Sequence, residues 1–311
     1  VLFSSNEQWV DPIFKRIRDA NTQLGYVNEI MERPTSSTPT NGDMSTYVPD
    51  ISAYIQTRVS DAIRKATSKS DVLKCGGSLL DAAVEDSTIL TNTLATIGEM
   101  HRDFGYKVIL TIGGGPRHDA EKAILNILSD EAGSEQYADA ARNVMYRQAC
   151  LLEAVGRSIG LPVAKVPPEH LSLLDLRGDQ LRSVIPIVYL TNSDIPASES
   201  DAHTLQFAED ARLPVVRFLK NTPGIYDRDP NVHGTKRNRF HQTIPAQEIL
   251  DGKIDRTGDD GLGNHLIETS ALELLQTFKY TKAVHIVDGT KPAEVKKALI
   301  GAPTGSYILQ G

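Results

Sequence analysis

The sequence predicts an α/β protein in which a largely parallel sheet is covered by helices on both faces, from about residue 71 to the end. Short apolar segments alternate with longer amphipathic ones, and glycine-rich turns follow the first two apolar segments. In such folds ligands bind at the carboxyl ends of the strands. The predicted strands span residues 72–75, 107–112, 163–166, 185–190, 215–219, 284–287 and 306–309. The predicted helices span residues 88–104, 119–128, 138–159, 202–211, 266–278 and 292–299.

Composition and charge exclude several classes of protein. The 311 residues are 40% hydrophobic and 23% charged, which is typical of a soluble globular protein of about two domains. The net charge of −7 disfavours partners such as nucleic acid or an anionic membrane. Cys75 and Cys150 lie in apolar segments and no signal-peptide pattern is present, so we expect reduced thiols and a cytoplasmic location. The eight histidines lack metal-ligand spacing, so no protein-bound metal is predicted.

The first 70 residues differ from the rest of the chain. Apolar residues at helical spacing in residues 1–33 and 51–66 predict a helical N-terminal extension. A polar segment rich in Pro, Ser, Thr and Gly predicts a flexible linker near residues 34–46. The main domain is then expected over residues 71–311.

The first predicted strand carries one lysine and is followed by a glycine turn. Val72, Leu73 and Cys75 suit a buried strand, and a buried Lys74 would need an anionic partner. Gly76, Gly77 and Ser78 then open a helix, whose first N–H groups can bind an anion. The alternative is a surface lysine at a strand end, followed by an ordinary turn.

A second glycine turn follows the next predicted strand. Gly113, Gly114 and Gly115 stand between a strand and a helix, where backbone N–H groups can hold an anion. Arg117 could bind a carboxylate or phosphate bidentately, and His118 could add a donor. The alternative is a turn needed only for tight packing of strand against helix, with Arg117 in solvent.

Asp201 stands where the sequence predicts the start of a helix. It is therefore either an N-cap or first-turn acid, worth about 1 kcal/mol, or an acceptor that orients the Lys74 ammonium. The two roles are compatible.

A compact loop follows the strand predicted over residues 215–219. Its Pro-Gly turn, aromatic residue and Asp-Pro pair could frame a purine, with Tyr226 as an apolar wall. Tyr226 could equally be a loop anchor, and the Asp-Pro pair a plain turn. The candidate nucleotide-binding residues are Lys220, Asn221, Gly224, Tyr226, Asp229 and Pro230.

Three segments in this order resemble the amino acid kinase family. They are Lys74-Cys-Gly-Gly-Ser, Gly113-Gly-Gly and Thr222-Pro-Gly-Ile-Tyr-Asp-Arg-Asp-Pro. The resemblance extends from about residue 71 to the end. It is closest to the uridylate kinase branch and its non-enzymatic relative, the molybdenum storage protein. Ser306 replaces the family's usual threonine in the closing strand.

The resemblance implies a three-layer αβα sandwich, with the acceptor half at about residues 71–190 and the ATP half at about 191–311. It implies direct phosphoryl transfer from ATP, with Mg2+ bridging the phosphates and catalysis by positioning and charge neutralisation. Lys74 would neutralise the transferred phosphoryl group and Asp201 would order that lysine. The glycine turns would bind phosphate or substrate, and the loop after residue 219 would border the nucleotide.

Departures from the family pattern leave the acceptor open. Family members place a second catalytic lysine before the late helix, where this chain has none; His265 or Lys220 could substitute. Uridylate kinases carry Asn-Leu-Phe-Arg-Gly after the triple glycine, so UMP is a poor candidate. We expect an ATP-dependent kinase for a small anionic metabolite near Arg117, in a homo-oligomer (dimer or higher). The alternative is a nucleotide-binding storage or regulatory protein that does no chemistry.

Overall fold

The computed structural model describes residues 70–113, 135–166, 180–189, 195–196, 199–228, 238–254 and 267–311. The predicted N-terminal extension before residue 70 and the predicted helix over residues 119–128 lie outside these ranges. The chain divides into two compact units, and the unit made of Lys69–Leu299 and Thr304–Gly311 contains the sheet. The predicted limits of the extension and of the two halves of the main domain stay predictions.

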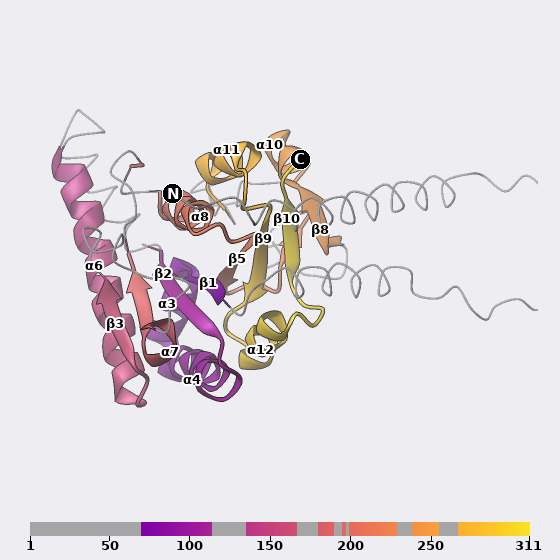
Figure 1. Ribbon diagram of the computed structural model, residues 1–311. Coiled ribbons are helices and arrows are strands. Elements are labelled where there is room, and N and C mark those ends of the chain that lie inside the picture. Colours follow the sequence, from indigo (N-terminus) through magenta and orange to yellow (C-terminus); the bar gives the residue numbers. More distant parts are fainter. Residues whose placement is uncertain are drawn as a thin grey trace, which may run out of the picture. The chain divides into compact units, whose positions relative to one another are not determined.

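An eight-stranded sheet forms the middle of this unit, in the order β3-β4-β2-β1-β5-β9-β10-β8 (Figure 1). Neighbouring strands are parallel except β9 and β10, which are antiparallel, so the prediction of a mainly parallel sheet is confirmed. A separate two-stranded ribbon pairs β6 (Ile225–Tyr226) with β7 (Phe240–His241). The strands of the large sheet are β1 (Ser70–Cys75), β2 (Lys107–Ile112), β3 (Val163–Val166), β4 (Ile185–Val188), β5 (Val215–Lys220), β8 (Thr243–Pro245), β9 (Ala283–Asp288) and β10 (Ser306–Leu309).

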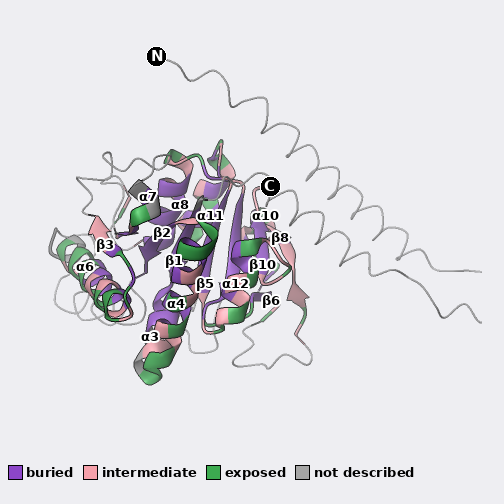
Figure 2. Cartoon of the chain, turned by 60° about the horizontal axis from the view of Figure 1, so that its bottom comes forward, coloured by how far each residue is buried: buried purple, intermediate pink, exposed green. Residues whose placement is uncertain are grey.

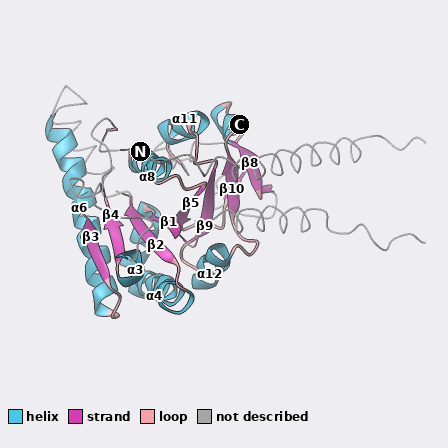
Figure 3. Cartoon of the chain, in the orientation of Figure 1, coloured by secondary structure: helices cyan, strands magenta, loops and turns pink. Residues whose placement is uncertain are grey.

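Helices cover both faces of the sheet, which confirms the three-layer αβα sandwich (Figure 3). One face carries α8 (Ser200–Asp210), α10 (Ala246–Leu250) and α11 (Thr269–Thr277). The other face carries α3 (Gly77–Glu85), α4 (Ser87–Phe104), α6 (Glu135–Ser158) and α12 (Pro292–Ile300). The short helix α7 (Gln180–Ser183) precedes β4. In the part of the chain that the structure describes, no helix combines the length and the apolar character that a membrane span requires.

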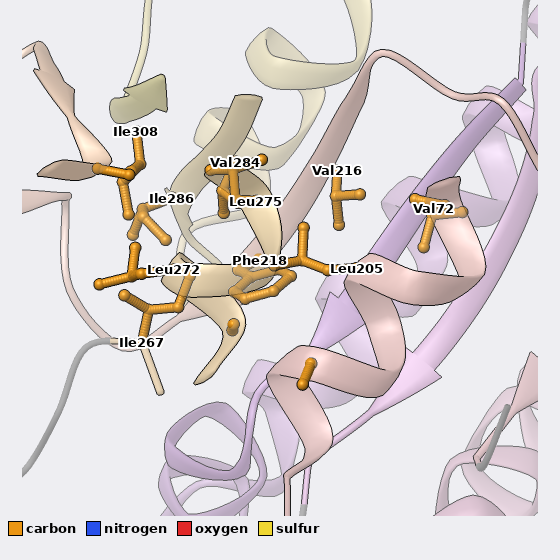
Figure 4. Close-up of a cluster of buried hydrophobic side chains, with 14 of the residues drawn as sticks. Val72, Leu205, Val216, Phe218, Ile267, Leu272, Leu275, Val284, Ile286 and Ile308 are labelled. Atoms are coloured by element: carbon orange, nitrogen blue, oxygen red, sulfur yellow. The ribbon is translucent and has the colours of Figure 1, made fainter. Parts of the chain in front are cut away.

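Two apolar clusters, one on each face, hold the layers together, and buried residues concentrate along the sheet (Figure 2). Figure 4 shows the cluster on the face of α8 and α11, where Leu205 lies beside Phe218 and Leu272 beside Ile286. Side chains of a strand alternate between faces, and β1 follows this rule: Val72 lies in this cluster, whereas Leu73 and Cys75 lie in the opposite one. The same alternation places the Lys74 side chain on the face of the sheet that α8 covers.

The predicted strands over residues 107–112, 163–166 and 306–309 match β2, β3 and β10. Other predicted boundaries differ from the observed ones by one to three residues. The strand predicted over residues 185–190 ends at Val188, and the helix predicted from residue 202 begins at Ser200. The helix predicted from residue 138 begins at Glu135, and the one predicted from residue 266 begins at Thr269. The pattern missed elements of two to five residues, because these are too short to show a period: α7, α10, β6, β7 and β8. Cys75 is buried and Cys150 half-buried, and both are free thiols.

Candidate active site

Lys74 is the centre of a polar cluster at the carboxyl end of β1. Its side chain is 1% exposed, and its ammonium forms an ion pair with Asp201 from the first turn of α8. The ammonium also donates a hydrogen bond to Ser200 Oγ at 2.7 Å. The structure therefore confirms a buried lysine with an anionic partner and contradicts the alternative of a surface lysine.

Burial and charge act against each other on this pair. Burial lowers the pKa of Lys74, while the Asp201 and Glu268 carboxylates oppose that shift. Burial by itself would raise the pKa of Asp201, but the Lys220 and Lys74 ammonium groups outweigh it and hold that pKa below its usual value. Asp201 is therefore ionised, and its charge keeps a cation in place inside the protein.

Lys220, at the end of β5, brings a second cation to the same carboxylate. Its Nζ lies 3.7 Å from Asp201 Oδ1, and its side chain is 13% exposed. Lys220 Nζ and Lys74 Nζ lie 5.6 Å and 5.2 Å from the centre of the Phe218 ring, so all three groups share one face of the sheet. Asp201 is thus flanked by two lysine ammonium groups, of which the Lys220 group is the more exposed.

Two glycine turns approach each other beside Lys74. A Cβ on Gly113 would lie 3.2 Å from Lys74 Cε and 3.0 Å from the backbone nitrogen of Gly77, so the hydrogen side chain permits this approach. A Cβ on Gly76 would lie 2.8 Å from the Leu219 carbonyl oxygen, which accepts the Gly76 N–H. Helix α3 begins at Gly77 without a capping side chain, which leaves its first N–H groups, at Gly77 and Ser78, for an anion.

The loop after β5 is anchored by the end of the chain. The Ile225 N–H donates to Ser306 Oγ at 2.9 Å, and this hydroxyl donates to the His241 carbonyl. The Tyr226 ring packs edge-on against the Phe240 ring, with the ring centres 5.1 Å apart. Tyr226 therefore anchors the ribbon of β6 and β7, which agrees with the alternative that it is a loop anchor. A Cβ on Gly224 would lie 2.3 Å from Ser306 Oγ. Asn221 is exposed beside Lys220.

Several predicted site residues lie outside the described ranges, so their assignments stay predictions: Gly114, Gly115, Arg117, His118, Asp229, Pro230 and His265. Within the described ranges, no group of three or more His, Cys, Asp or Glu side chains could hold a metal ion.

The sequence reading missed Glu268, the residue that precedes α11. Glu268 Oε2 accepts the N–H groups of Asp201 and Ala202 at 2.9 and 3.3 Å, and Oε1 accepts the Ser200 hydroxyl at 3.3 Å. In return the Glu268 N–H donates to Asp201 Oδ2 at 3.1 Å. Asp201 is therefore a first-turn acid of α8, as one of the alternatives expected, and not its N-cap, which is Glu199. Its carboxylate binds Lys74 and the start of α11. No local pattern signals this contact, because 67 residues separate the two acids.

Comparison with known proteins agrees with this architecture. The family model described as "Amino acid kinase family" matches residues 71–288. Uridylate kinase from Natronomonas pharaonis is 24% identical over 246 residues, which are 76% of this chain and 97% of that kinase. The molybdenum storage protein subunit beta from Azotobacter vinelandii is 24% identical over 245 residues, 76% of this chain and 84% of that subunit. Among solved structures, uridylate kinase from Archaeoglobus fulgidus superposes with a TM-score of 0.56 at 20% identity, covering 76% of this chain and 99% of that one.

Proposed function

Because the chain belongs to the amino acid kinase family, we propose that it is an ATP-dependent phosphotransferase. It moves the γ-phosphoryl group of ATP to a small anionic metabolite that carries a phosphate or carboxylate acceptor. The observation that carries this proposal is the buried Lys74, held by Asp201 between two glycine turns, with Lys220 beside it.

The described residues suit direct phosphoryl transfer, in which the protein positions the reactants and neutralises charge. Lys74 neutralises the transferred phosphoryl group, and Asp201 fixes the direction of its ammonium. The N–H groups of Gly77 and Ser78, at the start of α3, bind phosphate oxygens. Lys220 serves as the second cation, in place of the lysine that this chain lacks before its late helix.

The order of the strands supports separate binding regions for the acceptor and the nucleotide, one on each side of β1. The strands of residues 71–190 lie on one side of β1 and those of residues 191–311 on the other. We assign the acceptor to the first half, near Gly113–115, Arg117 and His118, and the nucleotide to the second. There Asn221, Gly224, Tyr226, Asp229 and Pro230 border the nucleotide.

Mg2+ belongs to this proposal as a companion of the nucleotide. Asp201 and Glu268, the two carboxylates at the described site, are both engaged by N–H groups or lysines. Phosphate oxygens would therefore hold the ion, which would neutralise phosphate charge when bound. A cytoplasmic location and a homo-oligomeric state complete the proposal.

The test measures ADP formed by the purified protein from Mg-ATP, with a panel of phosphate and carboxylate acceptors. We expect one acceptor to stimulate ADP formation and, with ATP, to raise the unfolding temperature; a ligand at ~100 Kd adds about 2.7 kcal/mol. The rival is a nucleotide-binding storage or regulatory protein that does no chemistry, and the similarity to a molybdenum storage protein subunit supports the storage role. Stabilisation by ATP without ADP formation with any acceptor would favour that rival and refute the kinase.

A further inference from the structure

We infer that Glu268 is a positioning residue of this site, whose carboxylate holds the first turn of α8, and with it Ser200 and Asp201, against the Lys74 ammonium. The inference rests on the proposed phosphotransferase function. Glu268 would touch neither nucleotide nor acceptor, and would act through the two side chains that contact Lys74.

The N-terminus of α8 depends on Glu268 because its own N-cap supplies no side-chain hydrogen bond. Both oxygens of the Glu268 carboxylate are used: Oε2 accepts two backbone N–H groups of the first turn, at 2.9 and 3.3 Å, and Oε1 accepts the Ser200 hydroxyl. A carboxylate at a helix N-terminus also interacts favourably with the helix dipole. The cap comes from another helix, so it fixes the position of α8 as well as its end.

The contact is reciprocal, because each helix start donates hydrogen bonds to a carboxylate of the other. We call these hydrogen bonds between Glu268 and the first turn of α8 the lock. The Glu268 N–H, at the start of α11, donates to Asp201 Oδ2 at 3.1 Å, while Asp201 Oδ1 faces Lys74. One carboxylate of the site thus binds the start of α11 with one oxygen and the lysine with the other. Ser200 Oγ forms a second connection between Lys74 and Glu268, since it accepts a hydrogen bond from Lys74 Nζ at 2.7 Å and donates one to Glu268.

Charged groups on three neighbouring elements act on Glu268. Burial, then the Asp201 carboxylate on α8, raise the pKa of Glu268 to about 7, while Lys74 on β1 and Lys220 on β5 oppose the shift. Protonation of Glu268 turns one carboxylate oxygen into an O–H donor and removes the negative charge, which weakens its hydrogen bonds from the three donors of α8. Activity that depends on this lock should therefore rise with pH around neutrality.

Folding stability should follow the opposite trend. A carboxyl whose pKa is higher in the folded than in the unfolded protein binds its proton more tightly when folded. The stability from this group is full below the unfolded value of about 4.5 and is lost as pH rises through about 7. Opposite trends in activity and stability distinguish a positioning role from a purely structural one.

The first test compares wild type, Glu268→Gln and the control Glu273→Gln in steady-state kinetics from about pH 5.5 to 8.5. Glu273 is an exposed acid on α11, the helix that Glu268 precedes. We expect kcat of Glu268→Gln at the upper pH to fall roughly 10- to 100-fold, with KM for ATP little changed and the acid limb of the profile flattened. Wild-type kcat and an unchanged acid limb in this variant would overturn the inference.

A second readout does not depend on activity. Carboxyl 13C NMR of wild-type protein labelled in Glu and Asp should show Glu268 titrating near pH 7, assigned from the spectrum of Glu268→Gln. The Asp201 signal should shift with the same midpoint. Titration of Glu268 near its usual value would overturn the inference. If the wild type forms no ADP with any acceptor while Glu268 titrates as expected, the proposed function fails and the lock stands.

Discussion

The Lys74 ammonium and the Asp201 carboxylate, 127 residues apart in the sequence, meet in a buried ion pair at the end of β1. We therefore predict that Lys74→Met lowers kcat by roughly 10²- to 10³-fold, as for the loss of one preorganised group that stabilises the transition state. Lys220, 3.7 Å from the same carboxylate, compensates part of the charge that the substitution leaves behind. ATP binding, measured by thermal shift, should persist.

The control for this variant is Lys253→Met, which removes an exposed lysine that pairs only with Glu248 among the described residues. It should keep the kcat of the wild type. A Lys74→Met enzyme within about threefold of wild-type kcat would contradict the role of Lys74.

Lys220 should act as the second cation of the site. Lys220→Met should lower kcat by about 10- to 100-fold and raise the pKa of Asp201, because Lys220 is one of the two cations that lower it. Lys220→Arg should retain more activity than Lys220→Met, since it keeps the charge. The measurements are steady-state kinetics and the 13C titration of Asp201. Equal activity of Lys220→Met and wild type would refute this assignment.

Gly113 should be required for activity more than for stability. In Gly113→Ala the new methyl group lies 3.2 Å from Lys74 Cε and 3.0 Å from the Gly77 nitrogen, in the space between the two turns. We expect a drop in kcat/KM of about tenfold or more, with little change in the unfolding temperature.

Gly156→Ala provides the matched contrast. Its methyl group would lie 2.7 Å from Val163 Cγ2, where α6 packs on the outermost strand of the sheet. This variant should lose about 1–3 kcal/mol of stability while each folded molecule keeps its activity. The same loss of activity in both variants would mean that Gly113 has only a packing role.

Arg217 and Asp71 form a second buried ion pair, on the face of α12. Both are 2% exposed, and Arg217 Nε also donates to the Ala298 carbonyl at 3.2 Å. Arg217→Met leaves a buried carboxylate without its partner and should cost about 3–5 kcal/mol in urea unfolding. The double variant Asp71→Leu/Arg217→Met should recover most of that loss. If the double variant is less stable than the single one, the pair contributes net stability.

Buried histidine should make the protein sensitive to acid. Burial, then the Arg217 cation, lower the pKa of His285 to about 3. Its ring is stacked on Tyr307 at 4.0 Å. The unfolded chain takes up a proton below about pH 6.5 and the folded chain does not, so stability is full above that pH and is lost as pH falls toward the folded value. By pH 4 the loss should be on the order of 3 kcal/mol.

His285→Phe keeps the stacked ring and removes the titrating group. Its free energy of unfolding should change less than that of wild type between about pH 6.5 and 4. Parallel pH curves for the two proteins would show that His285 contributes no acid sensitivity.

The sequence predicted the parts of the site that follow from strand ends. Residues after parallel strands meet at one edge of the sheet, so Lys74, Gly113 and Lys220 could be grouped without coordinates. Asp201, at the predicted start of a helix, was a candidate partner of Lys74 on the sequence alone, and the resemblance supported that role. Glu268 could not be found in this way, because its position is set by how α11 packs beside α8, which no local pattern encodes. Tyr226 was ambiguous for a similar reason: its partner Phe240 comes from a separate two-residue strand.

The central place of β1 limits how the molecule can move. β1 is hydrogen-bonded to β2 on one side and to β5 on the other, and the strands of the two halves extend outward from it. A hinge between the halves would break the backbone ladder that carries Lys74. The sheet is thus one continuous platform across both halves, with the strand that carries Lys74 inside it. We therefore expect the spacing between the two halves to stay nearly constant when ligands bind.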